Sequence, residues 1–431
     1  MRKTGIDLML KNIIEELKSV YAVGIDVSKG RSTVTIRKPG NKVVMPPRNF
    51  KHTQSEVNEL IAYIRNLDGE TKVCMECTGR YYEPMASWLH DAGIFVSAVN
   101  PLLIKKFGGD SIREAKTDKK DAIKIARYTL DKWNNLKEYT NTDEIRSQLK
   151  TMNRQFEFYI EQRAAMKNNL IAILDQTYSG VNNFFDSPAR KDGSQKWVDF
   201  AYTFWHVDIV RSMSLEDFSS SYKDWCKANG YNFSQTKAKE VYDASLDLIA
   251  VLPMDKITQV LVQQAIDTLN ATSKTVETFR LKMDEIASTL PEYPVVIDMY
   301  GVGHTLGPQL IAEIGDVTRF EKRTSLTAFA GVDPQTDESG DKVSKSVPTS
   351  KKGSPYLRKT LFQIMDGLLK TKNKNDPVYA FIDRKRDAGK PYHVYMTAGA
   401  NKFLRIYFGR VREFLGVSGK NKNIKKDADE A

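Results

Sequence analysis

The order of strands and helices expected between Tyr21 and Leu130 restricts the fold of this chain more than any other feature of its sequence. Short apolar or alternating stretches, typical of strands, are separated by segments whose apolar residues recur at helical spacing. The order along the chain is three strands, helix, strand, helix, strand, helix, which predicts a layered α/β domain. The predicted strands are Ala22–Asp26, Ser32–Arg37, Lys42–Met45, Lys72–Cys77 and Ile94–Val99, and the predicted helices follow Thr53 and cover Tyr82–His90 and Asp118–Leu130.

After Asn141 the pattern changes to long helices. Apolar residues recur at intervals of three and four from Ile145 to Leu174 and again from Leu261 to Leu290, which indicates either a coiled coil or two core helices of a compact bundle. The intervening segment, near 178–232, is rich in Ser, Asp and aromatic residues and receives no assignment. We expect four regions: an α/β domain at 1–140, coiled-coil helices with the insert at 141–293, a mainly α domain at 294–418, and a flexible tail at 419–431.

The chain is basic, with 65 Lys and Arg against 54 Asp and Glu and a formal net charge of +11. This excess favours a polyanionic partner such as nucleic acid, because each cation placed on a phosphate releases condensed counterions. Three cysteines, Cys74, Cys77 and Cys226, are too few for a disulfide framework and indicate a reducing compartment. Because no run of about 18 apolar residues occurs, we expect no membrane span. The reducing compartment indicated by the cysteines is expected to be the cytoplasm.

Four acidic residues fall at strand ends or in one helical turn of the predicted α/β domain. Asp26 and Glu76 end the first and fourth strands, while Asp118 and Asp121, three residues apart, share a helix face. If these carboxylates converge, they would repel one another unless a divalent cation neutralised them. Oxygen ligands suit Mg²⁺ or Mn²⁺, which support phosphodiester chemistry. The alternative is that Asp118 and Asp121 belong to a solvated helix face among lysines.

Basic residues surround these acids in the sequence. They are candidates for holding phosphates near the metal, or else they form a salt-bridged surface with Asp110 and Glu114. The residues are Lys105, Lys106, Arg113, Lys116, Lys119 and Lys120.

A second group of candidate residues lies in the C-terminal region. Gly301 and Gly303 precede an apolar periodic helix, a pattern similar to a helix-hairpin-helix, in which backbone N–H groups approach a phosphate. An ordinary glycine turn is the alternative. Ser339, next to Gly340, is either a turn residue or an activated nucleophile. Basic residues expected to bind nucleic acid in this region are Lys345, Lys351, Lys352 and Arg358.

Several stretches of the first domain resemble one protein family. They are VGIDVSK at 23–29, MECTGRYYEPMASWLHDAG at 75–93, and VNPLLIKKF followed by REAKTDKKDA. These stretches look like the DEDD-type insertion-sequence transposases, the bridge-RNA-guided recombinases. The resemblance implies a ribonuclease-H-like domain similar to the Holliday-junction resolvase RuvC, for which the predicted order of elements is also an analogy. It places the family's four metal-binding acids on Asp26, Glu76, Asp118 and Asp121.

The stretch FAGVDPQTDESGDKVSKSVPTSKKGSPYLRKTLFQ resembles the C-terminal serine transposase domain of the same family. This resemblance implies that Ser339 is the catalytic nucleophile. Ser344 and Ser346 lie close enough to leave the register of this assignment open, whereas Ser354 is interpreted as part of a turn.

The resemblance as a whole implies a bacterial insertion-sequence transposase, a DNA recombinase that cuts and exchanges donor and target DNA strands. A structured bridge RNA would guide it, and the metal-bound carboxylates and Ser339 would carry the chemistry. Because two DNAs must be held together, a homodimer or homotetramer is implied. The alternatives are a metal-dependent RuvC-like junction nuclease without covalent serine chemistry and a non-catalytic nucleic-acid scaffold.

Overall fold

The computed structural model describes residues 20–77, 81–107, 117–139, 144–334, 338–339, 342–343 and 349–416. The chain divides into two compact units, Met1–Asn141 and Thr142–Ala431, called here the N-terminal unit and the C-terminal unit. None of the helices in the described ranges is both long enough and apolar enough to cross a membrane.

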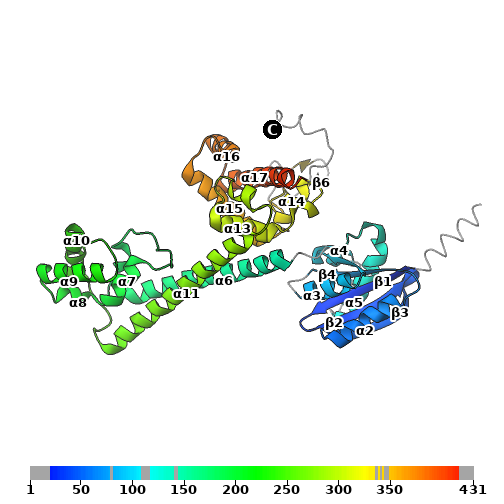
Figure 1. The fold of residues 1–431 in the computed structure, drawn as a ribbon, viewed down its shortest axis with the longest axis horizontal. Coiled ribbons are helices and arrows are strands. Elements are labelled where there is room, and N and C mark those ends of the chain that lie inside the picture. Colours follow the sequence, from blue (N-terminus) through cyan, green and yellow to red (C-terminus); the bar gives the residue numbers. More distant parts are fainter. Residues whose placement is uncertain are drawn as a thin grey trace, which may run out of the picture. The chain divides into compact units, whose positions relative to one another are not determined.

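The N-terminal unit is built on one mixed sheet of five strands in the order β3-β2-β1-β4-β5 (Figure 1). Strand β1 pairs antiparallel with β2 and parallel with β4, while β2 pairs antiparallel with β3 and β4 parallel with β5. The predicted α/β domain, with this order of strands and helices, is therefore confirmed. The strands are β1 Val20–Ser28, β2 Arg31–Lys38, β3 Lys42–Lys51, β4 Glu70–Glu76 and β5 Phe95–Val99.

Strand β3 continues to Lys51, although the sequence predicts an end at Met45, just before Pro46 and Pro47. Proline cannot donate to the ladder, but β3 is an edge strand of its sheet, and one side of an edge strand needs no partner. The pairing of β3 with β2 also shifts register between Val34 and Arg37. Such an irregularity lets the strand pass the prolines without breaking the sheet.

Helices cover both faces of this sheet. Successive residues of a strand point to opposite faces, so Val73 lies in the core under α2 and α3, whereas Cys74 lies in a smaller core with Ile125 of α5. A side chain two residues after Cys74 on β4 therefore faces the α5 side of the sheet. The helices are α2 Gln54–Arg65, α3 Tyr82–Asp91, α4 Pro101–Phe107 and α5 Asp118–Asp131.

Two long helices, α6 Glu144–Leu174 and α11 Lys256–Ser288, pack along each other in the C-terminal unit. Buried apolar residues recur on both helices, as the sequence predicts for this part of the chain. A coiled coil in the strict sense, with side chains of one helix inserted between four of the other, stays a prediction.

The unassigned segment and the residues that follow it fold into short helices around an aromatic core at one end of α6 and α11. Trp225 stacks on Tyr222 with ring centroids 5.6 Å apart and meets Phe200 edge-on at 5.5 Å. Leu170 of α6 and Val262 of α11 complete this core. The helices are α7 Lys196–Thr203, α8 Val207–Arg211, α9 Leu215–Ala228 and α10 Gln235–Leu246.

The rest of the C-terminal unit is mainly helical and shares one core with the other end of α6 and α11. Leu149 and Phe156 of α6 and Met283 of α11 are buried in this core among residues of the later helices. The remaining elements are α12 Tyr293–Ile297, α13 Gly303–Ile314, α14 Arg323–Ala330, β6 Glu338–Ser339, β7 Lys342–Val343, α15 Pro355–Thr371, α16 Pro377–Asp387 and α17 Tyr392–Phe414.

Candidate active site

The first candidate site lies where the parallel strands β1 and β4 end on the same edge of the sheet. Gly24 of β1 is in register with Cys74 of β4, and the pairing continues for one more residue on each strand. Asp26 and Glu76 are the next residues along these two strands. Because side chains two residues apart on a strand share a face, both carboxylates face the same side as Cys74, which is the α5 side.

Helix α5 crosses β1 at Gly24, at a distance that only glycine permits. A Cβ atom on Gly24 would lie 2.3 Å from the carbonyl oxygen of Ala122. The first turn of α5 immediately precedes Ala122 and carries Asp118 and Asp121. The close crossing therefore fixes the acidic turn of α5 beside the strand that carries the first carboxylate.

The start of α5 has its own structural determinants. The side chain of Thr117 caps the helix by accepting a hydrogen bond from the backbone N–H of Lys120, at 3.3 Å. Acidic residues are favoured in a first turn by the helix dipole. Asp118 is exposed and forms an ion pair with Arg31 at 3.6 Å, so this carboxylate has a structural partner as well as a candidate catalytic one.

The carboxylates share an edge of the sheet, but they do not form a closed set of metal ligands. Throughout the part of the chain that the structure describes, no three side chains of His, Cys, Asp or Glu are arranged to hold a metal ion. The donor set is nevertheless made only of carboxylate oxygens, the ligands that Mg²⁺ and Mn²⁺ prefer. A hard divalent cation therefore suits the donor atoms of the four candidate ligands, Asp26, Glu76, Asp118 and Asp121.

The basic residues predicted to surround this site are only partly described. Lys105 and Lys106 lie exposed on α4, and Lys119 and Lys120 lie exposed on the first turn of α5. Exposed lysines beside an acidic turn are available to phosphates of a nucleic acid. The predicted Arg113 and Lys116 lie outside the described residues.

The candidate nucleophile Ser339 is the last residue of strand β6, which is paired antiparallel with β7, and Ser339 is in register with Lys342. Pro334 and Thr349, on either side of these strands, form an isolated bridge. We call the segment between them, which contains β6 and β7, the serine hairpin. The predicted Lys345 and the neighbouring Ser344 and Ser346 lie outside the described residues.

The base of the serine hairpin is joined to the end of α14 by backbone hydrogen bonds. The N–H of Ser350 donates to the carbonyl of Asp333 at 2.9 Å, and that of Lys351 donates to Gly331 at 3.1 Å. Arg358 donates to the carbonyl oxygens of Ala330 and Gly353 at 3.0 Å each. This predicted DNA contact therefore holds two loops together, and burial lowers the pKa of its guanidinium.

A buried acidic residue that the sequence analysis missed anchors the same loops. Glu313 of α13 accepts hydrogen bonds from Asn153 and Arg154 of α6, both at 2.8 Å, and from the hydroxyl of Ser354 at 3.1 Å. Ser354 is also the N-cap of α15, because its hydroxyl accepts from the N–H of Leu357. A glutamate within a long apolar stretch was the only signal in the sequence for this network.

The two glycines of the predicted phosphate-binding turn play different structural parts. Gly301 has a φ of 77°, and a Cβ there would lie 3.0 Å from Leu368 of α15, so packing requires a glycine. Gly303 has a φ of 60°, begins α13 and borders open space. Binding of phosphate at this turn stays a prediction.

Comparison with known proteins assigns the chain to a family. A family model of DEDD transposases of the IS110 type matches residues 23–179. A second, described as Transposase IS116/IS110/IS902 family, matches residues 294–379. The two matches together cover more than half of the chain. The chain belongs to the IS110 family of transposases.

Relatives of this transposase extend over most of its length. An IS110 insertion-element protein of Streptomyces coelicolor is 22% identical over 75% of the chain and 77% of the relative. The pilin gene-inverting proteins of Moraxella bovis and Moraxella lacunata are each 24% identical over 84% of the chain and 88% of the relative. A solved structure of T. thermophilus RuvC with a Holliday junction substrate matches 28% of the chain and 99% of that protein, with 12% identity and a TM-score of 0.20.

The first family match includes Asp26, Glu76, Asp118 and Asp121, and the second includes Ser339 and the loops that join its hairpin to α14. The predicted membership of an insertion-sequence transposase family is confirmed, and so is the class of enzyme, a transposase or DNA recombinase.

Proposed function

We propose that this transposase cuts and rejoins DNA with Asp26, Glu76, Asp118 and Asp121 as ligands of Mg²⁺ or Mn²⁺ and with Ser339 as nucleophile. The observations that support the proposal are the parallel pairing of β1 and β4, whose last paired residues come just before Asp26 and Glu76, and the close crossing of α5 over β1 at Gly24. Rigid strand ends hold acidic ligands in place with little freedom, which is what a catalytic metal site requires.

The metal, when bound, would polarise the phosphate and stabilise the leaving oxygen of a strand cut. The protein's own part is to hold the carboxylates. Asp26 and Glu76 are fixed by the sheet, while Asp118 and Asp121 move with α5. Exposed Lys119 and Lys120 on the same helical turn would hold the neighbouring backbone phosphates of the DNA.

The step assigned to Ser339 is a phosphoryl transfer. Its hydroxyl oxygen loses a proton and bonds to phosphorus, and the bond from phosphorus to a deoxyribose oxygen breaks. That oxygen takes up a proton and becomes a free hydroxyl. The phosphoserine ester keeps the energy of the broken bond, so that a second hydroxyl can later displace the serine and rejoin the strand.

Donor and target DNA are the substrates of this proposal, and a structured bridge RNA is the guide. Base pairing by the RNA would supply sequence recognition, while the basic protein holds backbones and shape. Two copies or four are expected, because both DNAs must be held through strand exchange.

The experiment is to trap reactions on end-labelled DNA, denature them, and map any covalent protein–DNA adduct by mass spectrometry, with and without the RNA that copurifies. Ser339→Ala should abolish both the adduct and recombination. Ser354→Ala is the control, because it removes a helix cap and a hydrogen bond to Glu313 but not the proposed nucleophile, so the adduct should stay detectable. An adduct that persists in Ser339→Ala would contradict the role of Ser339 as nucleophile. Recombination without RNA would contradict the role of the RNA as guide.

The carboxylates are tested separately with Asp26→Asn and Glu76→Gln. Each substitution keeps the size of the side chain and removes the charge that binds a cation, so strand cleavage in Mg²⁺ should be abolished while the RNA remains bound. Cleavage that depends on these acids but never yields an adduct would favour the metal-dependent junction nuclease. Full recombination by either variant would contradict the role given to that residue.

A further inference from the structure

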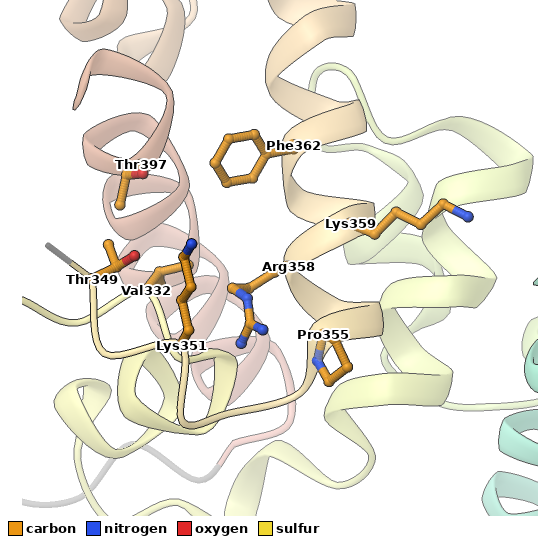
Figure 2. A pocket seen from close by; sticks show the side chains of 8 residues that line it. All are labelled: Val332, Thr349, Lys351, Pro355, Arg358, Lys359, Phe362 and Thr397. Carbon is orange, nitrogen blue, oxygen red and sulfur yellow. The ribbon is translucent and has the colours of Figure 1, made fainter. Parts of the chain in front are cut away.

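A cavity of about 260 Å³ lies at the base of the serine hairpin, between its last described residues, α15 and α17 (Figure 2). Thr349, one of the lining residues, is the partner of Pro334 in the bridge from which the hairpin extends. The cavity is therefore tied by the backbone to the segment that carries Ser339. Its lining consists of Val332, Thr349, Lys351, Pro355, Arg358, Lys359, Phe362 and Thr397.

The three basic residues of this lining have different surroundings. Lys359 turns away from the cavity in Figure 2, and its ammonium donates to the buried carboxylate of Glu157. Arg358 is held by two carbonyl oxygens at the floor of the loops. Lys351 is exposed, and Figure 2 shows its ammonium reaching between Thr349 and Arg358. Lys351 thus supplies the available positive charge of the cavity.

Lys351 is held in a backbone conformation that lysine seldom adopts. Its φ is 51°, in the left-handed region, and only two other described residues apart from glycines share this feature, Asn41 and Lys372. The hydrogen bond from its own N–H to Gly331 and those of Ser350 to Asp333 keep it there. Strain of this kind persists where the surroundings impose it, and it concentrates at binding sites.

Much of the remaining lining is apolar. Val332 is buried, Pro355 begins α15, and the ring of Phe362 points toward Thr397 of α17 (Figure 2). An aromatic ring and aliphatic walls beside one cation suit a ligand with a flat base and a phosphate, because bases stack on aromatic rings. The volume lies just below the range of about 300 Å³ and more that is usual for small-molecule sites. One base fits this space better than a whole cofactor.

We propose that this cavity takes a single unpaired nucleotide, with its base against Phe362 and its phosphate on Lys351. The inference rests on one part of the proposed function, that the chain binds nucleic acid at the serine hairpin. A nucleotide drawn out of its strand and held here fixes the position of neighbouring phosphates relative to the hairpin. Enzymes that act within a duplex draw out nucleotides in this way.

The test uses full-length protein and duplexes with one bulged nucleotide, compared with the same duplexes in which the bulge lacks its base. Wild-type protein should bind the bulge that carries a base about tenfold more tightly, an effect typical of one stacked base. Phe362→Leu should lose this preference. Phe414→Leu, at the exposed end of α17, is the matched control and should keep it. A bulge made of RNA in a parallel series shows whether the nucleotide comes from DNA or from the guide.

The charge is tested by Lys351→Gln against Lys372→Gln, since Lys372 has the same φ of 51° and lies at the far end of α15. Lys351→Gln should weaken binding and lower the slope of log affinity against log salt concentration by about one. Lys372→Gln should change neither. Lys351→Gly should raise the melting temperature, because glycine fits this backbone, while binding still falls.

Iodouracil placed in the bulge should form a photo-cross-link that maps to Phe362. A wild-type protein indifferent to the base of the bulge, or cross-links that map outside the cavity, would overturn the inference. None of these measurements requires strand cleavage. If the bulge preference holds while no serine adduct forms, the nucleotide site is supported and the role of Ser339 as nucleophile is rejected. The reverse result rejects only the nucleotide site.

Discussion

The two candidate sites of this transposase are held in place by different means. In the N-terminal unit, Asp26 and Glu76 stand on neighbouring parallel strands, and their relative position follows from the register of the sheet. In the C-terminal unit, Lys351 and Ser354 lie in a loop whose position depends on hydrogen bonds to the end of α14 and to Glu313 of α13. One site is fixed by regular backbone pairing, and the other by a few specific polar contacts.

This difference determines which substitutions should disturb each site. A sheet register is shared among many hydrogen bonds, so the carboxylate site should be sensitive mainly to how closely α5 approaches β1. A loop held by individual contacts should be sensitive to the loss of a single buried polar group, even one far away in the sequence.

The largest effect on stability is expected for Glu313→Ala. It would leave Arg154 without the carboxylate that it contacts at 2.8 Å, and breaking such a buried pair costs about 3 kcal/mol of the free energy of unfolding. Glu313→Gln keeps part of the hydrogen bonding and should cost less. The measurement is urea denaturation of the full chain.

The matched control for Glu313 is an exposed ion pair of the same unit, Arg410 with Asp298, at 2.8 Å. Asp298→Ala should change the free energy of unfolding by less than about 1 kcal/mol, because exposed pairs are screened by water. Equal losses for Glu313→Ala and Asp298→Ala would mean that the loop of Ser354 does not depend on buried polar contacts.

A smaller effect is expected for Gly24→Ala, which tests the approach of α5 to the sheet. The added methyl would meet backbone atoms of α5 well inside contact distance, and a forced shift of this kind costs about 1 to 3 kcal/mol. Because Asp118 and Asp121 move with α5, strand cleavage should fall further than stability alone explains. Activity and denaturant midpoint are measured on the same preparations.

Gly40→Ala is the control for Gly24→Ala. Gly40 has a φ of 71° and open space around its Cβ position, so alanine there strains the backbone without placing an atom against α5. It should cost about 1 kcal/mol and leave cleavage unchanged in folded protein. If cleavage falls equally in both variants, the close crossing does not position the carboxylates.

The same difference explains what could be predicted from the sequence. The layered domain and the order of its strands and helices along the chain follow from the spacing of apolar residues, because strands and helices bury side chains at different intervals. The predicted β3 is too short because a proline in the sequence suggests the end of a strand. Whether a strand tolerates proline depends on whether a neighbouring strand pairs with it on that side.

In the C-terminal unit, spacing indicated the helices but not the contacts that hold the loops. Glu313 and Asn153 are 160 positions apart, and nothing local indicates that they meet. The segment near 178–232 lacked a visible repeat because its helices are short and its core is aromatic, so few turns of each helix display a pattern.

Near neutral pH the smallest effect is expected for Cys74, which lies beneath α5 two residues before Glu76, because its thiol affects stability only above about pH 9. Burial raises the pKa of this thiol to about 12, against an ordinary value of 9.0, although a hydrogen bond with Thr129 acts in the opposite direction. The folded state therefore keeps the proton between pH 9 and 12, where the unfolded chain loses it. The stability that depends on the protonated thiol is complete below pH 9 and is lost as the pH rises to 12. The free energy of unfolding falls by at most about 1.4 kcal/mol per pH unit in this range.

At pH 8 iodoacetamide should modify the half-buried Cys77 of the folded protein while Cys74 reacts only after opening or unfolding. The rate at Cys74 then measures how often α5 lifts from the sheet, and with it Asp118 and Asp121. Gly24→Ala should increase that rate, whereas Glu313→Ala, in the other unit, should leave it unchanged. Mass spectrometry of the labelled peptides gives both rates. Equal rates at Cys74 and Cys77 would show that α5 is mobile on the sheet, and the carboxylate site would then owe its position to bound ligands rather than to the packing at Gly24.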